Sequence, residues 1–217
     1  MIPSRYPEEK LFDRVSESRD RDEINQLEQL TNPRLREERG EVPGFSSSER
    51  ATGKGSSYIM AAFAYINPEG SRFSDGSFGV YYAARTLATA VAECVYHREL
   101  FMRRTKEPPM RLDMRVLTAT LNAEMHDIRG MKSKFKKVYS RKNYSESRSL
   151  AVQLRQEGSF GIAYDSVRDP GGECLAVFRP KALDHCRRER HMIFEWNGKK
   201  IAKVFQLQEF ISEDESP

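Results

Sequence analysis

Two segments rich in glycine and aromatic residues have the composition of buried structure and also carry four polar side chains of different chemistry. The first contains Arg72, Tyr82 and Glu93 at spacings of ten and eleven residues. The second, far downstream, places Ser166 between an apolar stretch and a Gly-Gly turn. Polar groups in buried structure need a partner or a function. A cation, a phenol, a carboxylate and a hydroxyl are therefore candidates for one site.

The composition limits the chain to an ordinary globular class. Of its 217 residues, 31% are charged and 38% apolar, and we expect residues 1–217 to form a single domain. The 36 basic and 32 acidic residues are interleaved and leave a net charge of +4. That excess is too small to indicate a nucleic-acid-binding surface, so we do not expect direct nucleic-acid binding.

The sequence predicts a cytoplasmic protein without a membrane segment. No apolar run approaches the roughly 18 residues that a spanning helix needs, and the N-terminus lacks the apolar region of a signal peptide. Three widely separated cysteines favour reduced thiols over a disulfide framework. His185, Cys186 and His191 resemble metal ligands, but no second pair follows at zinc-finger spacing, and we expect no metal.

Apolar periodicity and turn residues predict the secondary structure. Residues 58–66 are a nine-residue apolar run that is either a buried strand or a buried helix, because length and period do not decide. The basic stretch from Lys132 to Lys142 is expected to be a solvated face. The other predicted elements are a strand near 11–15, an interrupted helix over 17–41, strands over 79–84, 110–121, 160–167, 174–180 and 200–210, and helices over 87–104 (capped by Thr86) and 147–157.

Each polar residue also has an ordinary structural interpretation. Glu93 lies at the edge of a helical apolar stripe, where a carboxylate is usually solvated or paired with a basic residue. Arg72 is spaced to pair with Asp75 on the surface. Tyr82 suits a strand as a core residue, and a serine such as Ser166 usually satisfies backbone groups.

The two segments resemble the RES domain family, named for Arg, Glu and Ser. The family's YxA and AxxE patterns match YAA, which begins at Tyr82, and AVAE, which ends at Glu93. Its Gly-Gly-Arg-Trp-Asn stretch corresponds to GSRFS around Arg72, without the second glycine and the asparagine. The string GIAYDSVRDPGG around Ser166 is the most family-specific, and LFDRV around Arg14 is similar to the family's opening strand. The resemblance is densest over 70–100 and 158–180.

The resemblance implies an α+β fold, with a compact mixed β-sheet and flanking helices as in ADP-ribosyltransferases. It also implies an enzyme that is the toxin of a toxin–antitoxin pair, consumes NAD as its substrate and is restrained by an Xre-family helix-turn-helix antitoxin. Glu93, Tyr82 and Ser166 would be catalytic, and Arg72, Arg14 and Tyr82 would bind NAD. A carboxylate at this position would stabilise the oxocarbenium-like centre that forms when the nicotinamide–ribose bond breaks.

Other functions stay open at this level. The ADP-ribose acceptor could be water, phosphate or a protein, and the residues do not discriminate among them. An RNA-acting basic toxin and a catalytically degenerate binding domain are the alternatives from other classes. The sequence also leaves open whether the protein forms a homodimer.

Overall fold

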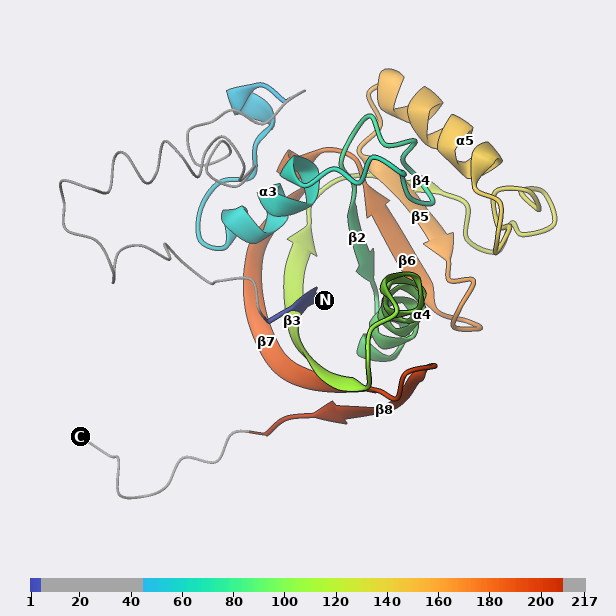
Figure 1. Cartoon of the computed structure of the whole chain (residues 1–217). Coiled ribbons are helices and arrows are strands. Elements are labelled where there is room, and N and C mark those ends of the chain that lie inside the picture. Colours follow the sequence, from blue (N-terminus) through green and yellow to red (C-terminus); the bar gives the residue numbers. More distant parts are fainter. Residues whose placement is uncertain (5–44, 209–217) are drawn as a thin grey trace, which may run out of the picture.

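Two four-stranded sheets carry the fold in the computed structural model, which describes residues 1–4 and 45–208. Together with three α-helices among the described residues, they confirm the expected α+β class (Figure 1). The strands are divided between two sheets, and only the second mixes parallel and antiparallel pairs. The strand expected near 11–15, the helix over 17–41 and Arg14 lie outside the described residues.

The first sheet has the order β1-β3-β7-β8 and is antiparallel throughout. Its strands are β1 (Ile2–Pro3), β3 (Met110–Leu121), β7 (Leu183–Trp196) and β8 (Ile201–Gln206). The alternating pattern over 110–121 is confirmed as β3, and β8 lies within the predicted last strand. The pairing of β3 with β7 contains two register shifts, which are irregularities of the kind that bend strands. Figure 1 shows both strands strongly curved.

The second sheet has the order β2-β6-β5-β4. Its strands are β2 (Tyr81–Ala84), β6 (Glu173–Val177), β5 (Gly161–Asp165) and β4 (His126–Asp127). The predicted pair of strands joined by a glycine turn is confirmed as β5 and β6, which are antiparallel neighbours. Because successive side chains of a strand alternate in direction, Tyr82 shares one face of this sheet with Tyr164 and Cys174, and Tyr81 lies on the other.

Three α-helices accompany the sheets: α3 (Ser56–Ala64), α4 (Leu87–Thr105) and α5 (Ser145–Gln156), with short 3-10 turns η1 (Ser47–Glu49) and η2 (Pro180–Ala182). The ambiguous apolar run is helical and forms most of α3. As predicted, α4 begins after Thr86, whose side-chain oxygen accepts a 3.2 Å hydrogen bond from the backbone nitrogen of Thr89. The helix predicted over 147–157 is α5.

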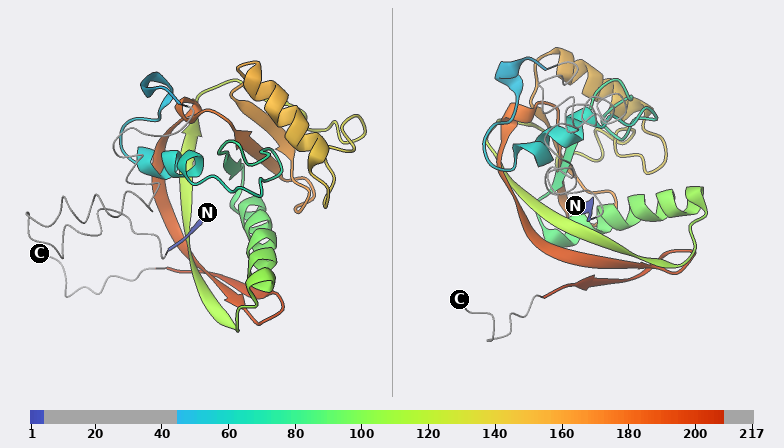
Figure 2. Two further views of the ribbon diagram at one scale, coloured as in Figure 1. Left: turned by 45° about the horizontal axis from the view of Figure 1, so that its top comes forward. Right: turned by 60° about the vertical axis from the view of Figure 1, so that its left-hand side comes forward.

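The buried apolar residues form three clusters that hold these elements together. One joins the second sheet to α5 through Ile162, Ala151 and Phe178, and another packs α3 between the two sheets. The third fills the space between α4 and the curve of β3, β7 and β8, an arrangement that is visible in both views of Figure 2. The sheets thus hold α4 beside the turn that follows β5.

Candidate active site

Glu93 and Ser166 meet between α4 and the turn after β5. The Ser166 hydroxyl donates a 2.6 Å hydrogen bond to Glu93 Oε1. Ser166 Oγ also accepts hydrogen bonds from the backbone nitrogens of Arg168 and Asp169, at 3.0 and 2.9 Å. A hydroxyl has one donor and two acceptor positions, so Ser166 has none left for a ligand. Its side chain is 1% exposed, whereas Glu93 is half-buried.

Arg72 is a buried cation surrounded by carbonyl groups and an aromatic ring. Its side chain is 8% exposed, and Nη1 donates to the carbonyl oxygens of Val138 and Ser140 at 3.0 and 2.9 Å. Cζ lies 4.5 Å from the centre of the Tyr144 ring. No carboxylate of the described residues pairs with Arg72. The alternative partner, Asp75, instead accepts hydrogen bonds from Ser77, which lower the pKa of its carboxyl.

Tyr82 holds the segment that carries Arg72. Its hydroxyl accepts a 2.8 Å hydrogen bond from the backbone nitrogen of Phe73 and lies 2.7 Å from Ser71 Oγ. The two partners are the residues on either side of Arg72. Tyr82 is 39% exposed as a residue, yet burial of its hydroxyl raises the pKa of Tyr82 to about 12, so the phenol keeps its proton at neutral pH. The hydroxyl is thus engaged structurally, and the ring is the part that a ligand can contact.

Some residues around Glu93 were not assigned to the site from the sequence. The Arg168 guanidinium lies 3.4 Å from the centre of the Tyr96 ring, and its Nη2 donates to the carbonyl oxygen of Arg141 at 2.9 Å. His97 follows Glu93 by one helical turn. His97 is exposed as a residue, but burial of its imidazole lowers its pKa; Glu93 raises it, whereas Arg168 and Arg72 lower it further.

The basic stretch behaves only partly as predicted. The side chains of Lys132, Lys134, Lys136 and Lys137 are exposed as expected, whereas the backbone of the same stretch supplies both carbonyl oxygens that hold Arg72. The signal that could have found this role is the placement of Val138 and Tyr139 among the lysines, because both pack against the core of the second sheet.

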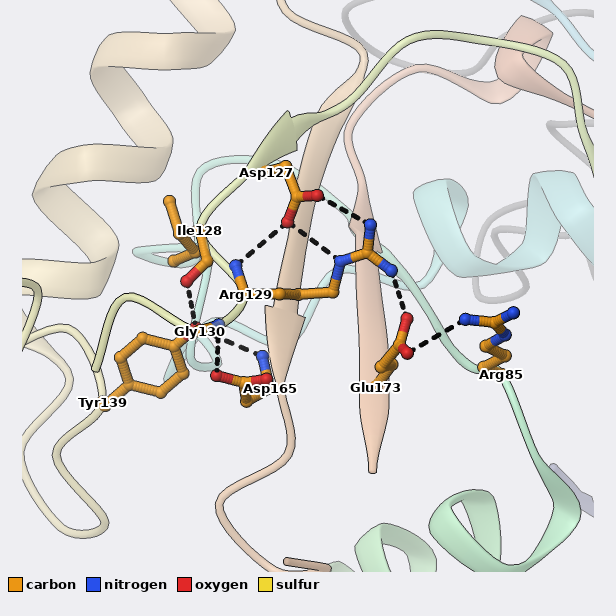
Figure 3. Close-up of polar contacts among 8 residues, drawn as sticks. All are labelled: Arg85, Asp127, Ile128, Arg129, Gly130, Tyr139, Asp165 and Glu173. Carbon is orange, nitrogen blue, oxygen red and sulfur yellow. Dashed lines mark hydrogen bonds and ion pairs between the residues drawn. The ribbon is translucent and has the colours of Figure 1, made fainter. Parts of the chain in front are cut away.

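A second charged cluster lies on the opposite face of the second sheet from Tyr82 (Figure 3). Arg129 pairs with Asp127 and Glu173, and Glu173 also pairs with Arg85. The bonds from Arg129 lower the pKa of Asp127 to about 2. A cavity of about 480 Å³ borders this cluster. These charges neutralise one another. The buried Arg72 has no carboxylate partner among the described residues, and this cation distinguishes its side of the sheet as the candidate site.

Comparisons with known proteins identify the family of this chain. The family model described as RES domain matches residues 49–197. This chain belongs to the RES domain family. It is 31% identical over 209 residues to the uncharacterized protein y4oC of Sinorhizobium fredii, and the match covers 96% of this chain and 86% of that protein. RES domains are associated with toxin–antitoxin systems and are generally similar to enzymes that act on NAD.

The four predicted site residues that the structure describes form two pairs. Tyr82 contacts the residues on either side of Arg72, Ser71 and Phe73. Tyr82 also shares a sheet face with Tyr164, whose ring meets the Phe73 ring edge to face, with 4.8 Å between their centres. Ser166 and Glu93 form their own contact. Among residues 1–4 and 45–208, no group of three metal-binding side chains occurs, and none of the helices is long and apolar enough to cross a membrane.

Proposed function

We propose that this RES protein is a toxin that cleaves the nicotinamide–ribose bond of NAD. The observation that supports the proposal is the position of the Glu93 carboxylate. Its Oε1 accepts a 2.6 Å hydrogen bond from the Ser166 hydroxyl, whose other hydrogen-bonding positions are already occupied. A carboxylate that its neighbours hold in place can stabilise a positive charge that develops in a transition state, because it does not have to reorganise during the reaction.

Bond cleavage in NAD produces such a charge. When the C1′–nitrogen bond of the nicotinamide ribose breaks, its electron pair passes to the pyridinium nitrogen and nicotinamide leaves as a neutral molecule. C1′ then has oxocarbenium-like character, as in glycoside hydrolysis. Glu93 stabilises it, and the oxygen of water or phosphate adds to C1′. With water, one proton is released and the product is ADP-ribose.

The other residues have roles in binding NAD. Arg72 donates its hydrogen bonds through Nη1, and Nε and Nη2 form none with the described residues. A guanidinium with free donors in a fixed plane suits the oxygen atoms of a pyrophosphate. The exposed ring of Tyr82 is suited to stacking on the nicotinamide. Arg14, outside the described residues, is proposed as a second cation for the pyrophosphate.

An antitoxin partner completes the proposal. We expect an Xre-family helix-turn-helix protein, produced together with this cytoplasmic toxin, to cover the site between α4 and the second sheet. NAD and the antitoxin would then exclude each other because both occupy one concave site.

Incubation of the purified protein with NAD tests the activity. Nicotinamide release should be observed by chromatography, and the second product should be ADP-ribose in phosphate-free buffer. A phosphorylated ADP-ribose that forms only with added phosphate identifies phosphorolysis, and transfer of label from NAD to added protein identifies ADP-ribosylation. RNA cleavage without nicotinamide release would contradict the proposal.

A further inference from the structure

We infer that Thr89 and Asp169 are positioning residues that set the geometry of the Glu93–Ser166 contact. The Thr89 hydroxyl donates a 2.7 Å hydrogen bond to Asp169 Oδ2. This bond joins the same two elements as the contact between Ser166 and Glu93. The inference rests on the proposed function, because it deepens the account of how the Glu93 carboxylate is held for the reaction.

Thr89 lies on the face of α4 that carries Glu93. The two residues are four positions apart, which places them one above the other on a helix. Thr89 is 1% exposed, and its hydroxyl also lies 2.9 Å from the oxygen of the N-capping residue, Thr86. The start of the helix therefore fixes the direction of the Thr89 hydroxyl.

Asp169 connects Thr89 to Ser166 through its backbone. The Asp169 nitrogen donates to Ser166 Oγ at 2.9 Å, while the Asp169 carbonyl accepts from the Gly172 nitrogen at 3.0 Å. The Gly172 carbonyl in turn accepts from the Ser166 nitrogen at 2.7 Å. The turn is thus closed on itself, and its position relative to α4 depends on the side-chain contacts that join the two.

Gly172 shows how closely the turn and the helix approach. A Cβ atom at this position would lie 2.6 Å from Thr89 Oγ1 and 2.7 Å from Asp169 Oδ2. A Cβ atom does not approach another heavy atom this closely, so glycine is needed here for space, whereas Gly171 has a left-handed φ of 82° and nothing within 4 Å of its Cβ position. The two adjacent glycines therefore have different structural roles, and only Gly172 leaves room for the Thr89–Asp169 hydrogen bond.

Among the described residues, three side-chain contacts join α4 to this turn: Thr89 with Asp169, Glu93 with Ser166, and Tyr96 with Arg168. They follow one another along α4 at spacings of four and three residues, which is one helical stripe. Loss of the first contact should allow the turn to shift against α4. A displacement on the order of 1 Å in a catalytic group can reduce the rate about a hundredfold.

The test compares variants that remove or retain the hydroxyl. Thr89→Val has the same shape without the donor, and Thr89→Ser keeps the donor. We expect Thr89→Val to lower kcat for NAD cleavage by roughly tenfold to a hundredfold with KM for NAD unchanged. Thr89→Ser should stay within about threefold of the parent protein. The kcat of Asp169→Ala should fall as far as that of Thr89→Val. Asp169→Asn keeps an acceptor oxygen, so its kcat should resemble that of Thr89→Ser.

A second measurement makes the result independent of the proposed activity. Hydrogen exchange of the Arg168 and Asp169 amides, which both donate to Ser166, should accelerate in Thr89→Val and not in Thr89→Ser. If the parent protein does not cleave NAD, the proposed function is wrong, and the exchange data still decide whether Thr89 holds the turn. Equal kcat and equal exchange in Thr89→Val and the parent protein would overturn the inference, as would equal losses in the valine and serine variants.

Discussion

The Ser166 hydroxyl lies 2.6 Å from Glu93 Oε1, although 73 residues separate the two in sequence. Ser166 belongs to a closed turn and Glu93 to the second turn of a long helix, so each side chain is held by a different element. The serine oxygen makes all three of its hydrogen bonds within the protein. This arrangement argues against a nucleophilic serine and in favour of a carboxylate whose position is fixed before substrate binds.

The first prediction concerns the charge of Glu93. Glu93→Gln keeps the shape and removes the charge, so turnover of NAD should fall by roughly two orders of magnitude or more, a few kcal/mol in the barrier. Glu99→Gln is the matched control on the same helix, because Glu99 accepts from the backbone nitrogen of Ile201 and pairs with Arg103. It should lower Tm and leave kcat unchanged. Near-parental turnover in Glu93→Gln would exclude Glu93 from catalysis.

The second prediction concerns the planar guanidinium of Arg72. Arg72→Lys keeps the charge and loses the free donors, each of which contributes about 1.5–3 kcal/mol to a charged acceptor. NAD should therefore bind roughly tenfold to a hundredfold more weakly in a calorimetric titration. Arg179→Lys, which alters a half-buried arginine paired with Glu49, serves as the control and should bind NAD normally. Equal affinities in the two variants would indicate that Arg72 is purely structural.

Two adjacent tyrosines provide the third prediction. Tyr82→Phe leaves the backbone nitrogen of Phe73 without its acceptor, and Phe73 is 1% exposed. An unsatisfied buried donor costs about 1–3 kcal/mol, which urea denaturation should detect. KM for NAD should rise because the segment around Arg72 is loosened, while the ring remains. Tyr81→Phe, on the other face of β2, should leave KM unchanged; a rise in KM in both variants would contradict this assignment.

The elements that sequence analysis predicted are those with a local signal. The cap at Thr86 and the apolar stripe after it define α4, and the glycine turn defines β5 and β6. The strand β7 was missed because its middle is the charged run Arg187–Arg190, and the paired strands shift register there, so apolar alternation is interrupted. The nine-residue run in α3 was too short for its period to decide.

The sequence named candidate site residues but not their arrangement. The family resemblance named Arg72, Tyr82, Glu93 and Ser166, but the partners of Arg72 come from 66 and 68 residues downstream. The apolar Val138 and Tyr139 indicate that the lysine-rich stretch packs against the core, but they do not indicate which cation its carbonyl groups hold. Long-range pairings of this kind depend on how the sheet and α5 pack.

The fourth prediction concerns the pH dependence of stability through His97. Burial holds its pKa in the folded protein below the ordinary value of 6.5, so the unfolded chain binds a proton first as pH falls. Stability should therefore decrease as pH falls through about 6.5, down to the folded-state pKa. His97→Gln removes this contribution, and its Tm should decline less than that of the parent protein between pH 7.5 and about 5.5. Parallel declines in the Tm of the two proteins would show that the pKa of His97 is not lowered in the folded state.

The last prediction concerns the effect of the protein in cells. Expression of this chain alone should deplete NAD and stop growth, and co-expression of the antitoxin should restore both, because an antitoxin bound over the site excludes substrate. The Glu93→Gln protein should be harmless and still bind the antitoxin, since Glu93 is one of many residues such a partner would contact. Cellular NAD after induction is the deciding measurement: growth arrest with undiminished NAD would reject NAD depletion and leave protein ADP-ribosylation or an RNA target as the cause of toxicity.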